Sequence, residues 1–163
     1  MTRRVFYSFH YELDAWRAAQ VRNMGVVEGN EPARDNDWET VKRGGDAEIK
    51  RWISRQMERR TCTIVLAGAK TAGRDWITHE IVESWNRGMG VAGIHIHGLI
   101  DKYRMTAAKG GNPFEHVSFN GGRLSSIVKC HDPPGGSSRE RLAWIRKNLA
   151  AIIEDAIDIR EKS

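Results

Sequence analysis

Apolar positions along the chain fall into two kinds of block, which together favour a parallel α/β arrangement. Continuous apolar runs of strand length occupy residues 3–9, 61–67 and 91–97, and such runs are typical of strands covered on both faces. Shorter runs at residues 26–27 and 126–130 predict a brief second strand and a last strand. Segments with apolar residues at every third or fourth position lie between these runs, a spacing typical of helices with one buried side.

The first helix is expected at residues 13–23, after the turn that leaves the first strand. Leu13 and Trp16 recur at helical spacing with Ala19 or Gln20. We therefore predict that these side chains form the inner side of the helix.

The second and last helices carry clear start signals. Asp46 follows two glycines and is the expected cap of the second helix. Ser137 and Glu140 form a capping box for the last helix. The expected buried stripes are Ile49, Trp52 or Ile53, and Met57 in the second helix, and Leu142, Ile145, Leu149, Ile152, Ile153 and Ala156 in the last.

The remaining helix, at residues 74–85, combines a core stripe with a second stripe whose role is open. Its core stripe consists of Ile77, Ile81 and Trp85. Trp76, Glu80 and Glu83 recur on a neighbouring face, so an indole lies one turn before a carboxylate near the positive end of the helix dipole. Such a pair is either part of an active site or a solvated flank with a half-buried tryptophan at its edge.

The alternation of strands and helices predicts a flavodoxin-like, doubly wound sheet of about five parallel strands with helices on both faces. Ligands of such sheets bind at the carboxyl ends of the strands, where the strand order reverses. We expect Phe9, His10 and residues 68–71 to line that crevice. Trp76 and Glu80 would face it from the start of the following helix. Two independent inferences therefore meet at Glu80, and they favour its functional interpretation.

Residues 28–45 form an expected long loop, because Gly, Asn, Asp and Pro accumulate there without periodicity. A structureless loop of this length in a compact domain is usually functional or mobile. It either covers a site or is a loose surface loop. Residues 100–124, rich in Gly, Lys and Asn, are expected to be an irregular excursion.

The composition, with 40% hydrophobic and 29% charged residues, agrees with one globular domain over residues 1–163. No apolar run approaches the roughly 20 residues that cross a bilayer, and residues 1–4 lead into a strand without a cleavage site. Cys62 and Cys130 lie far apart inside apolar runs, which indicates reduced, buried thiols rather than a disulfide or a zinc site. We therefore expect a cytoplasmic protein with no membrane partner.

The formal net charge of +5 narrows the ligand classes only slightly. Lys and Arg are scattered, so no nucleic-acid partner is expected, whereas a phosphate-bearing small ligand suits the charge. Lys70 and Arg74 would meet a diphosphate if they point into the crevice, and are otherwise solvated surface charges. His95 and His97 share one face of a strand without a third ligand, so we expect no metal and treat both as structural. No GxGxxG or P-loop motif supports a bound cofactor.

Two motifs resemble those of TIR domains. Residues 5–9 (VFYSF) are similar to the first-strand motif, and residues 75–81 (DWITHEI) to a later helix motif in which Glu follows Trp by four residues. The strand order, the long loop after the second strand and the length are similar across most of the chain. Within the TIR domains, the opening VFYSFHYELDAWRAAQVRN and the later TCTIVLAGAKTAGRDWITHEI resemble the ThsB family of the bacterial Thoeris antiphage system.

The resemblance implies a TIR fold and cleavage of the nicotinamide–ribose bond of NAD, which is then a substrate and not a cofactor. For Thoeris members it also implies an ADP-ribose-derived, cyclic signal that activates a downstream effector, and a homo-oligomer stays open. Carried residue by residue, the catalytic glutamate falls on Glu80 and the site tryptophan on Trp76. The exit of the first strand falls on Phe9 and His10, where a small polar residue is commoner at the second position. Lys70 is added as a phosphate contact from its charge.

The chemistry of this cleavage needs only one carboxylate. Nicotinamide leaves as a neutral molecule from a pyridinium cation, so the leaving group needs no acid, and positive charge develops on the ribose. Glu80 would stabilise that charge, whereas Trp76 and Phe9 offer flat surfaces for stacking. Two alternatives stay open: a nucleoside deoxyribosyltransferase-like enzyme, which directs a carboxylate at a sugar, and a non-catalytic TIR adaptor that functions by assembly.

Overall fold

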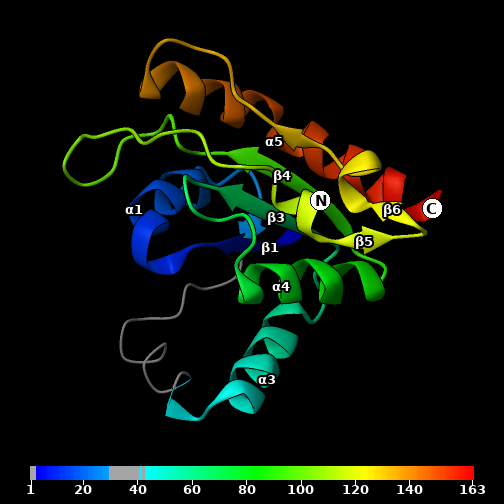
Figure 1. Ribbon diagram of the computed structural model, residues 1–163. Coiled ribbons are helices and arrows are strands. Elements are labelled where there is room, and N and C mark those ends of the chain that lie inside the picture. The colour runs from blue at the N-terminus through cyan, green and yellow to red at the C-terminus, as the bar shows by residue number, and fades with distance from the viewer. Residues whose placement is uncertain (1–2, 30–40, 42) are drawn as a thin grey trace.

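A five-stranded parallel sheet forms the centre of the protein in the computed structural model, which describes residues 3–29, 41 and 43–163 (Figure 1). The strand order is β2-β1-β3-β4-β7, and all four pairs are parallel. The strands are β1 (Arg4–Phe9), β2 (Glu28–Gly29), β3 (Cys62–Ala67), β4 (Gly90–His95) and β7 (Cys130–His131). The chain leaves β1 for β2 on one side and continues with β3 on the other, which confirms the doubly wound arrangement.

Helices cover both faces of this sheet, as Figure 1 shows. They are α1 (Tyr11–Arg22), α3 (Asp46–Met57), α4 (Asp75–Asn86) and α5 (Ser138–Glu161). α1 and α5 pack on one face over a core that includes Val21, Ile64 and Ile153. α3 and α4 pack on the other face, where Ile53 contacts Phe6 of β1 within a second apolar cluster. This second face is the one that carries the candidate site.

Of the three strands β1, β2 and β3, two agree with the sequence prediction, and β2 lies two residues later than predicted. β1 and β3 lie where they were predicted, and all six residues of β3 are buried. β2 occupies Glu28–Gly29 and not residues 26–27, which form a bend against the core. Gly29 lies beside Val5 of β1, and a Cβ there would meet the Tyr7 ring at 2.7 Å. The close approach therefore needs a glycine, and the two valines could not take its place.

The inner side of α1 differs from the prediction, because Leu13 and Trp16 are 48% and 54% exposed. The buried residues are instead Asp14, Arg17, Ala18 and Val21, and Ala19 and Gln20 are half-buried. Arg17 donates from Nε to the carbonyl oxygen of Leu99 over 2.9 Å, and its Nη1 pairs with Asp14 Oδ1 at 3.2 Å. A buried ion pair thus sets the orientation of α1, and apolar periodicity does not reveal such a pair.

Residues 113–128 form a folded unit against α4, although an irregular excursion and most of a strand were expected there. The unit contains η1 (Pro113–His116), the antiparallel pair β5 (Ser118–Phe119) and β6 (Gly122–Arg123), and η2 (Leu124–Ser126). Phe114 and Leu124 are 0% and 1% exposed and share an apolar cluster with Ile81 and Trp85 of α4. β7 starts only at Cys130, because the N–H groups of Ile127 and Val128 donate to the carbonyl oxygen of Leu124 in the turn that follows η2, and not to a strand.

The helix caps agree with the sequence for α5 and differ by one residue for α3. Ser137 Oγ accepts the N–H of Glu140 over 3.1 Å, and Glu140 Oε2 accepts the N–H of Gly136 over 3.2 Å. α3 begins at Asp46, but its cap is Gly45, whose φ of 80° lies in the left-handed region. Asp46 is therefore not the cap, and it occupies the first turn, where the helix dipole favours a carboxylate.

The two cysteines are free, with Cys62 buried and Cys130 half-buried. Burial raises the pKa of both thiols to about 12, so neither has the character of a reactive thiolate. Within the described part of the chain, no helix is long and apolar enough to cross a membrane.

Candidate functional site

A cavity of about 380 Å³ lies at the carboxyl end of β1, next to the point where the strand order reverses. The end of β1, the start of α1, one residue of α3 and the first half of α4 form its walls. The lining residues are Phe9, His10, Tyr11, Glu12, Ile49, Arg74, Trp76, Ile77 and Glu80. The structure thus brings four of the expected site residues, Phe9, His10, Trp76 and Glu80, into one cavity.

Glu80 is the buried carboxyl of this cavity, with 8% of its surface exposed. It lies on the buried side of α4, which it shares with Ile77 and Ile81. Ser8 Oγ of β1 donates a hydrogen bond to Glu80 Oε1 over 3.3 Å. Burial raises the pKa of the Glu80 carboxyl to about 8, and the hydrogen bond from Ser8 acts in the opposite direction. The group therefore exchanges its proton near neutral pH, as acids and bases of active sites do.

The backbone of α4 is also tied to the sheet next to Glu80. Ser84 Oγ donates to the carbonyl oxygen of Glu80 over 2.7 Å, and it lies 2.6 Å from Thr63 Oγ1 of β3. Since the Ser84 proton is used by the carbonyl, Thr63 is the donor in the second bond. Both hydroxyl side chains are 0% exposed. Two neighbouring strands thus hold the turn of α4 that carries Glu80.

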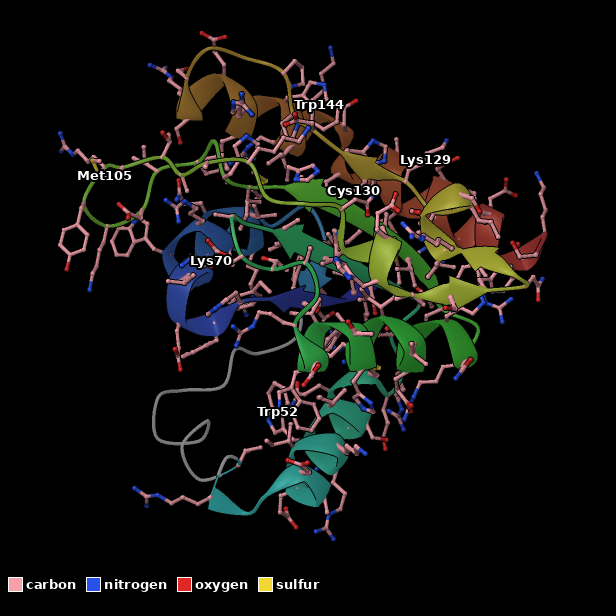
Figure 2. The ribbon with its side chains drawn as sticks, viewed as in Figure 1. Trp52, Lys70, Met105, Lys129, Cys130 and Trp144 are labelled. Carbon is pink, nitrogen blue, oxygen red and sulfur yellow. The ribbon has the colours of Figure 1, made fainter. Side chains whose placement is uncertain are left out.

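Trp76 lies one helical turn before Glu80 and is half-buried at the cavity wall. Its ring packs against the apolar cluster of α3, as Trp52 also does, and meets the His79 ring edge-on with centroids 5.6 Å apart. Figure 2 shows the labelled Trp52 between α3 and the start of α4. Trp76 therefore combines a packing role with access to the cavity, and its indole is held in place from the side of α3.

His10 follows β1 and caps α1 with its side chain, since its Nδ1 accepts the N–H of Leu13 over 3.3 Å. Burial, reinforced by the nearby charge of Arg74, lowers the pKa of His10. The neutral ring then carries its proton on Nε2, because Nδ1 is the acceptor. Phe9 stacks on Tyr11 with ring centroids 6.3 Å apart. His10 and Phe9 are thus fixed in the cavity wall, and Phe9 presents an aromatic surface to the cavity.

The charged candidates separate into one that lines the cavity and two that do not. Arg74, the N-cap residue of α4, lines it. Lys70, labelled in Figure 2, has an exposed side chain and is absent from the cavity wall. Glu83 pairs with Arg87 on the surface of α4 at 2.9 Å. Arg74 therefore occupies the place that the sequence analysis offered to either cation, and Glu83 is not a second carboxylate of the site.

Two parts of the site were beyond the sequence analysis. Ser8 was not singled out, although it is the one small polar residue among the buried residues of β1, and that exception was a usable signal. Ile49 was assigned to the core alone, yet it also lines the cavity. The expected loop at residues 28–45 begins with β2, and its residues 30–40 and 42 lie outside the described residues.

His95 and His97 lie apart from this cavity, at and just after the end of β4, which stops at His95 and not at residue 97 as predicted. Their rings meet edge-on with centroids 5.9 Å apart, and burial lowers the pKa of both. Nearby, Asp132 pairs with Lys109 at 3.0 Å and with Arg141 at 3.4 Å. Among the described residues, no group of three or more His, Cys, Asp or Glu side chains is arranged to hold a metal ion.

Comparison with known proteins gives two matches. The family model of the Thoeris protein ThsB, TIR-like domain, matches residues 6–101, a segment that contains most of β1, the Trp76–Glu80 turn and β4. A protein of Bacillus cereus (strain MSX-D12), named "Putative cyclic ADP-D-ribose synthase ThsB1", is 33% identical over 145 residues, which cover 86% of this chain and 76% of that protein. The chain therefore belongs to the ThsB family of TIR-like Thoeris proteins.

Proposed function

We propose that this protein cleaves the nicotinamide–ribose bond of NAD and converts the ADP-ribose part into a cyclic signal in antiphage defence. The observation that carries this proposal is the position of Glu80, a buried carboxyl with an elevated pKa in a cavity shared with Trp76. The name of the B. cereus relative, "Putative cyclic ADP-D-ribose synthase ThsB1", supports the same reaction. Family membership supports a role in Thoeris, where the signal would act on a separate effector.

The reaction divides into bond breaking and capture. The bond between the ribose C1 and the pyridinium nitrogen breaks, and its electron pair leaves with neutral nicotinamide. The resulting oxocarbenium ion is a cation beside Glu80, whose ionised carboxylate stabilises it. A hydroxyl of the same molecule then attacks C1 to give the cyclic product, or water attacks to give ADP-ribose. The attacking oxygen loses its proton to Glu80 or to solvent.

The charge of NAD explains how a carboxyl that is largely protonated near neutral pH becomes active. Burial raises the pKa of Glu80 to about 8, and no cation in the described part of the chain offsets its charge. A pyridinium ring bound in the cavity supplies that cation and favours the ionised form. We therefore expect NAD binding to release a proton from Glu80, and a reduced, uncharged nicotinamide ring to bind without that release.

The remaining lining residues suit the parts of the substrate that surround the reacting bond. Trp76 and Phe9 would stack against the nicotinamide ring, as aromatic side chains do with flat ligands. His10, with its proton on Nε2, would donate to a ribose hydroxyl or to the carboxamide oxygen. Arg74 would meet the diphosphate, for which a guanidinium is well suited. Lys70 does not line the cavity and would have no role in it.

The test is to incubate the purified protein with NAD and to follow nicotinamide release by chromatography and the adenine-containing product by mass. We expect turnover by the native protein and a loss of at least about a hundredfold in Glu80→Gln, which removes the charge and keeps the shape. Glu83→Gln is the matched control, because it changes the same residue type on the exposed side of the same helix. Its turnover should stay within about twofold of the native value.

Product mass separates the forms of the proposal. A product lighter than ADP-ribose by one water is the expected cyclic signal, whereas ADP-ribose itself would show hydrolysis alone. Undiminished turnover in Glu80→Gln would contradict the assignment of Glu80. If neither purified protein turns over NAD, the same pair is assayed in extracts of phage-infected cells, and inactivity there as well would favour the adaptor interpretation. Activity on deoxynucleosides but not on NAD would favour the deoxyribosyltransferase-like alternative.

A further inference from the structure

The hydrogen bond between Ser8 and Glu80 is unusual in its setting. Ser8 belongs to β1, in which Val5, Phe6 and Tyr7 are all at most 3% exposed. Its own side chain is 1% exposed, and its hydroxyl reaches across the interface between sheet and helix to Glu80 Oε1. Burying a hydroxyl in such surroundings is unfavourable unless it finds a partner. Here the partner is the carboxyl on which the proposed reaction depends.

We propose that Ser8 is a positioning residue for Glu80: its hydroxyl holds the carboxylate toward the cavity and stabilises its ionised form. The expected effect on catalysis rests on the proposed function. The hydrogen bond between Ser8 and Glu80, and its effect on the Glu80 carboxyl, do not depend on that function. β1 delivers Ser8 from a position whose backbone is paired with Val65 of β3, in the centre of the sheet. The donor is therefore fixed before any ligand binds, as preorganised electrostatic stabilisation requires.

No other described side chain competes for this role. The charged and titratable groups that face the cavity around Glu80 are His10, Tyr11 and Glu12 from the start of α1 and Arg74 from the start of α4. The wall contributed by α3 is Ile49, which is apolar. Among the described residues, Ser8 is the only one that forms a hydrogen bond or ion pair with the Glu80 carboxyl. Removal of its hydroxyl therefore leaves the carboxylate without a donor among the residues that the structure describes.

The bonds from Thr63 and Ser84 provide a matched control. Thr63 Oγ1 lies 2.6 Å from Ser84 Oγ, and Ser84 in turn donates to the backbone carbonyl of Glu80, not to its carboxyl. Thr63 is as completely buried as Ser8 and lies on the neighbouring strand. Thr63→Val removes a buried hydroxyl at nearly constant volume. It therefore reproduces the general cost of losing a buried hydrogen bond without touching the carboxyl.

The first experiment titrates Glu80 directly, in protein labelled with ¹³C at the glutamate side-chain carboxyls. The Glu80 signal is identified by its loss in Glu80→Gln, and its titration midpoint is compared in native protein, Ser8→Ala, Ser8→Cys and Thr63→Val. We expect Ser8→Ala to raise the midpoint by about one pH unit, because the ionised form loses its donor. Ser8→Cys retains the volume with a weaker donor, so it should give a smaller increase and serves if Ser8→Ala does not fold. Thr63→Val should leave the midpoint unchanged.

The second experiment measures the consequence for NAD cleavage. In Ser8→Ala, kcat/KM should be about tenfold lower than native below pH 7 and should approach the native value above about pH 9. An unchanged midpoint in Ser8→Ala and Ser8→Cys, an equal increase in Thr63→Val, or a loss of rate that is the same at every pH would overturn the role of Ser8. Because the titration needs no turnover, absence of NAD cleavage would count against the proposed function alone, and the midpoint would still decide the role of Ser8.

Discussion

The Glu80 cavity and the histidine pair at the end of β4 place buried ionisable side chains in two different settings. Glu80 is 8% exposed, and His95 and His97 are 5% and 9% exposed, so burial is similar. In both places burial is the main cause of the shifted pKa, and it favours the uncharged form. Glu80 borders a cavity of about 380 Å³, large enough for part of a ligand, and neither histidine lines that cavity.

The neighbouring charges account for the contrast. The cations near the histidine pair, Lys109 and Arg141, are already paired with Asp132, and neutral imidazoles lose little by burial. Glu80 has one hydroxyl donor and no cation partner among the described residues, so its charged form is left for a ligand to stabilise. A buried ionisable group thus indicates a ligand site when it has no partner of opposite charge and borders a cavity that could hold a charged ligand.

The largest expected effect is the change of NAD cleavage with pH that results from the titration of Glu80. Burial raises the pKa of this carboxyl to about 8, and the ionised form is the active one. Below this pH, kcat/KM should fall by about tenfold per pH unit, so that it rises by roughly a hundredfold between pH 6 and pH 9. A rate profile that is flat across this interval would show that Glu80 does not titrate in the free protein.

The Glu80→Gln variant should have a higher free energy of unfolding than the native protein at high pH, although the substitution lowers activity. The folded-state pKa of Glu80 is raised from 4.5 to about 8, so the folded protein binds more protons than the unfolded chain between these values. Native stability from this group therefore falls as the pH rises from about 4.5 and reaches its lowest level above pH 8. In urea titrations at pH 9, Glu80→Gln should be more stable than native by about 2 to 4 kcal/mol, with little difference at pH 4.5. Equal stabilities at pH 9 would contradict the burial of an ionised Glu80.

Replacement of Trp76 should weaken substrate binding by about tenfold, since loss of one stacking partner costs on the order of 1 to 3 kcal/mol. The measurement is the KM for NAD of Trp76→Ala, with thermal unfolding to confirm that the variant is folded. Trp144→Ala is a suitable control, because Trp144 is a half-buried residue of α5 that packs against the core on the opposite face of the sheet. An equal rise of KM in both variants would point to a general loss of packing and not to stacking on the substrate.

His95→Gln should have the smallest effects. NAD turnover should stay within about twofold of native, because His95 does not line the cavity. The pKa of His95 is lowered by burial, so its contribution to stability is complete above the unfolded value of about 6.5 and is lost as the pH falls. Between pH 7 and pH 5.5, Tm should therefore decrease by about 1 to 3 °C less in His95→Gln than in native protein. A large loss of NAD cleavage would instead extend the functional site to the end of β4.

Much of the fold followed from the sequence where burial alone sets the pattern. Strands β1 and β3 are covered on both faces, and Ile77 and Ile81 of α4 have the period of a one-sided helix. The predictions were wrong where buried polar groups or short secondary-structure elements determine the local structure. The buried pair of Arg17 and Asp14 reversed the expected inner side of α1.

The candidate site shows the same division. Trp76 and Glu80 were found because helical spacing and the switch point of the sheet converge on them, and the resemblance to TIR domains added the proposed chemistry. Lys70 and Arg74 were equivalent as cations four residues apart, and only the structure separates the one that lines the cavity. Ser8 stands out locally within β1, but its pairing with Glu80 could not be predicted, because a contact across 72 positions of the chain leaves no local pattern that indicates the partner.

The attachment of Arg17 to the segment after β4 has a practical consequence for protein engineering. Its guanidinium donates to the carbonyl oxygens of Leu99 and Met105, at 2.9 and 2.8 Å, and the N–H of Asp101 donates to Met105 over 3.0 Å. The base of this segment is therefore closed, whereas its tip at residues 102–104 is exposed. Short peptide tags or fluorophore acceptors inserted at the tip should be tolerated, which would provide a reporter position outside the Glu80 cavity.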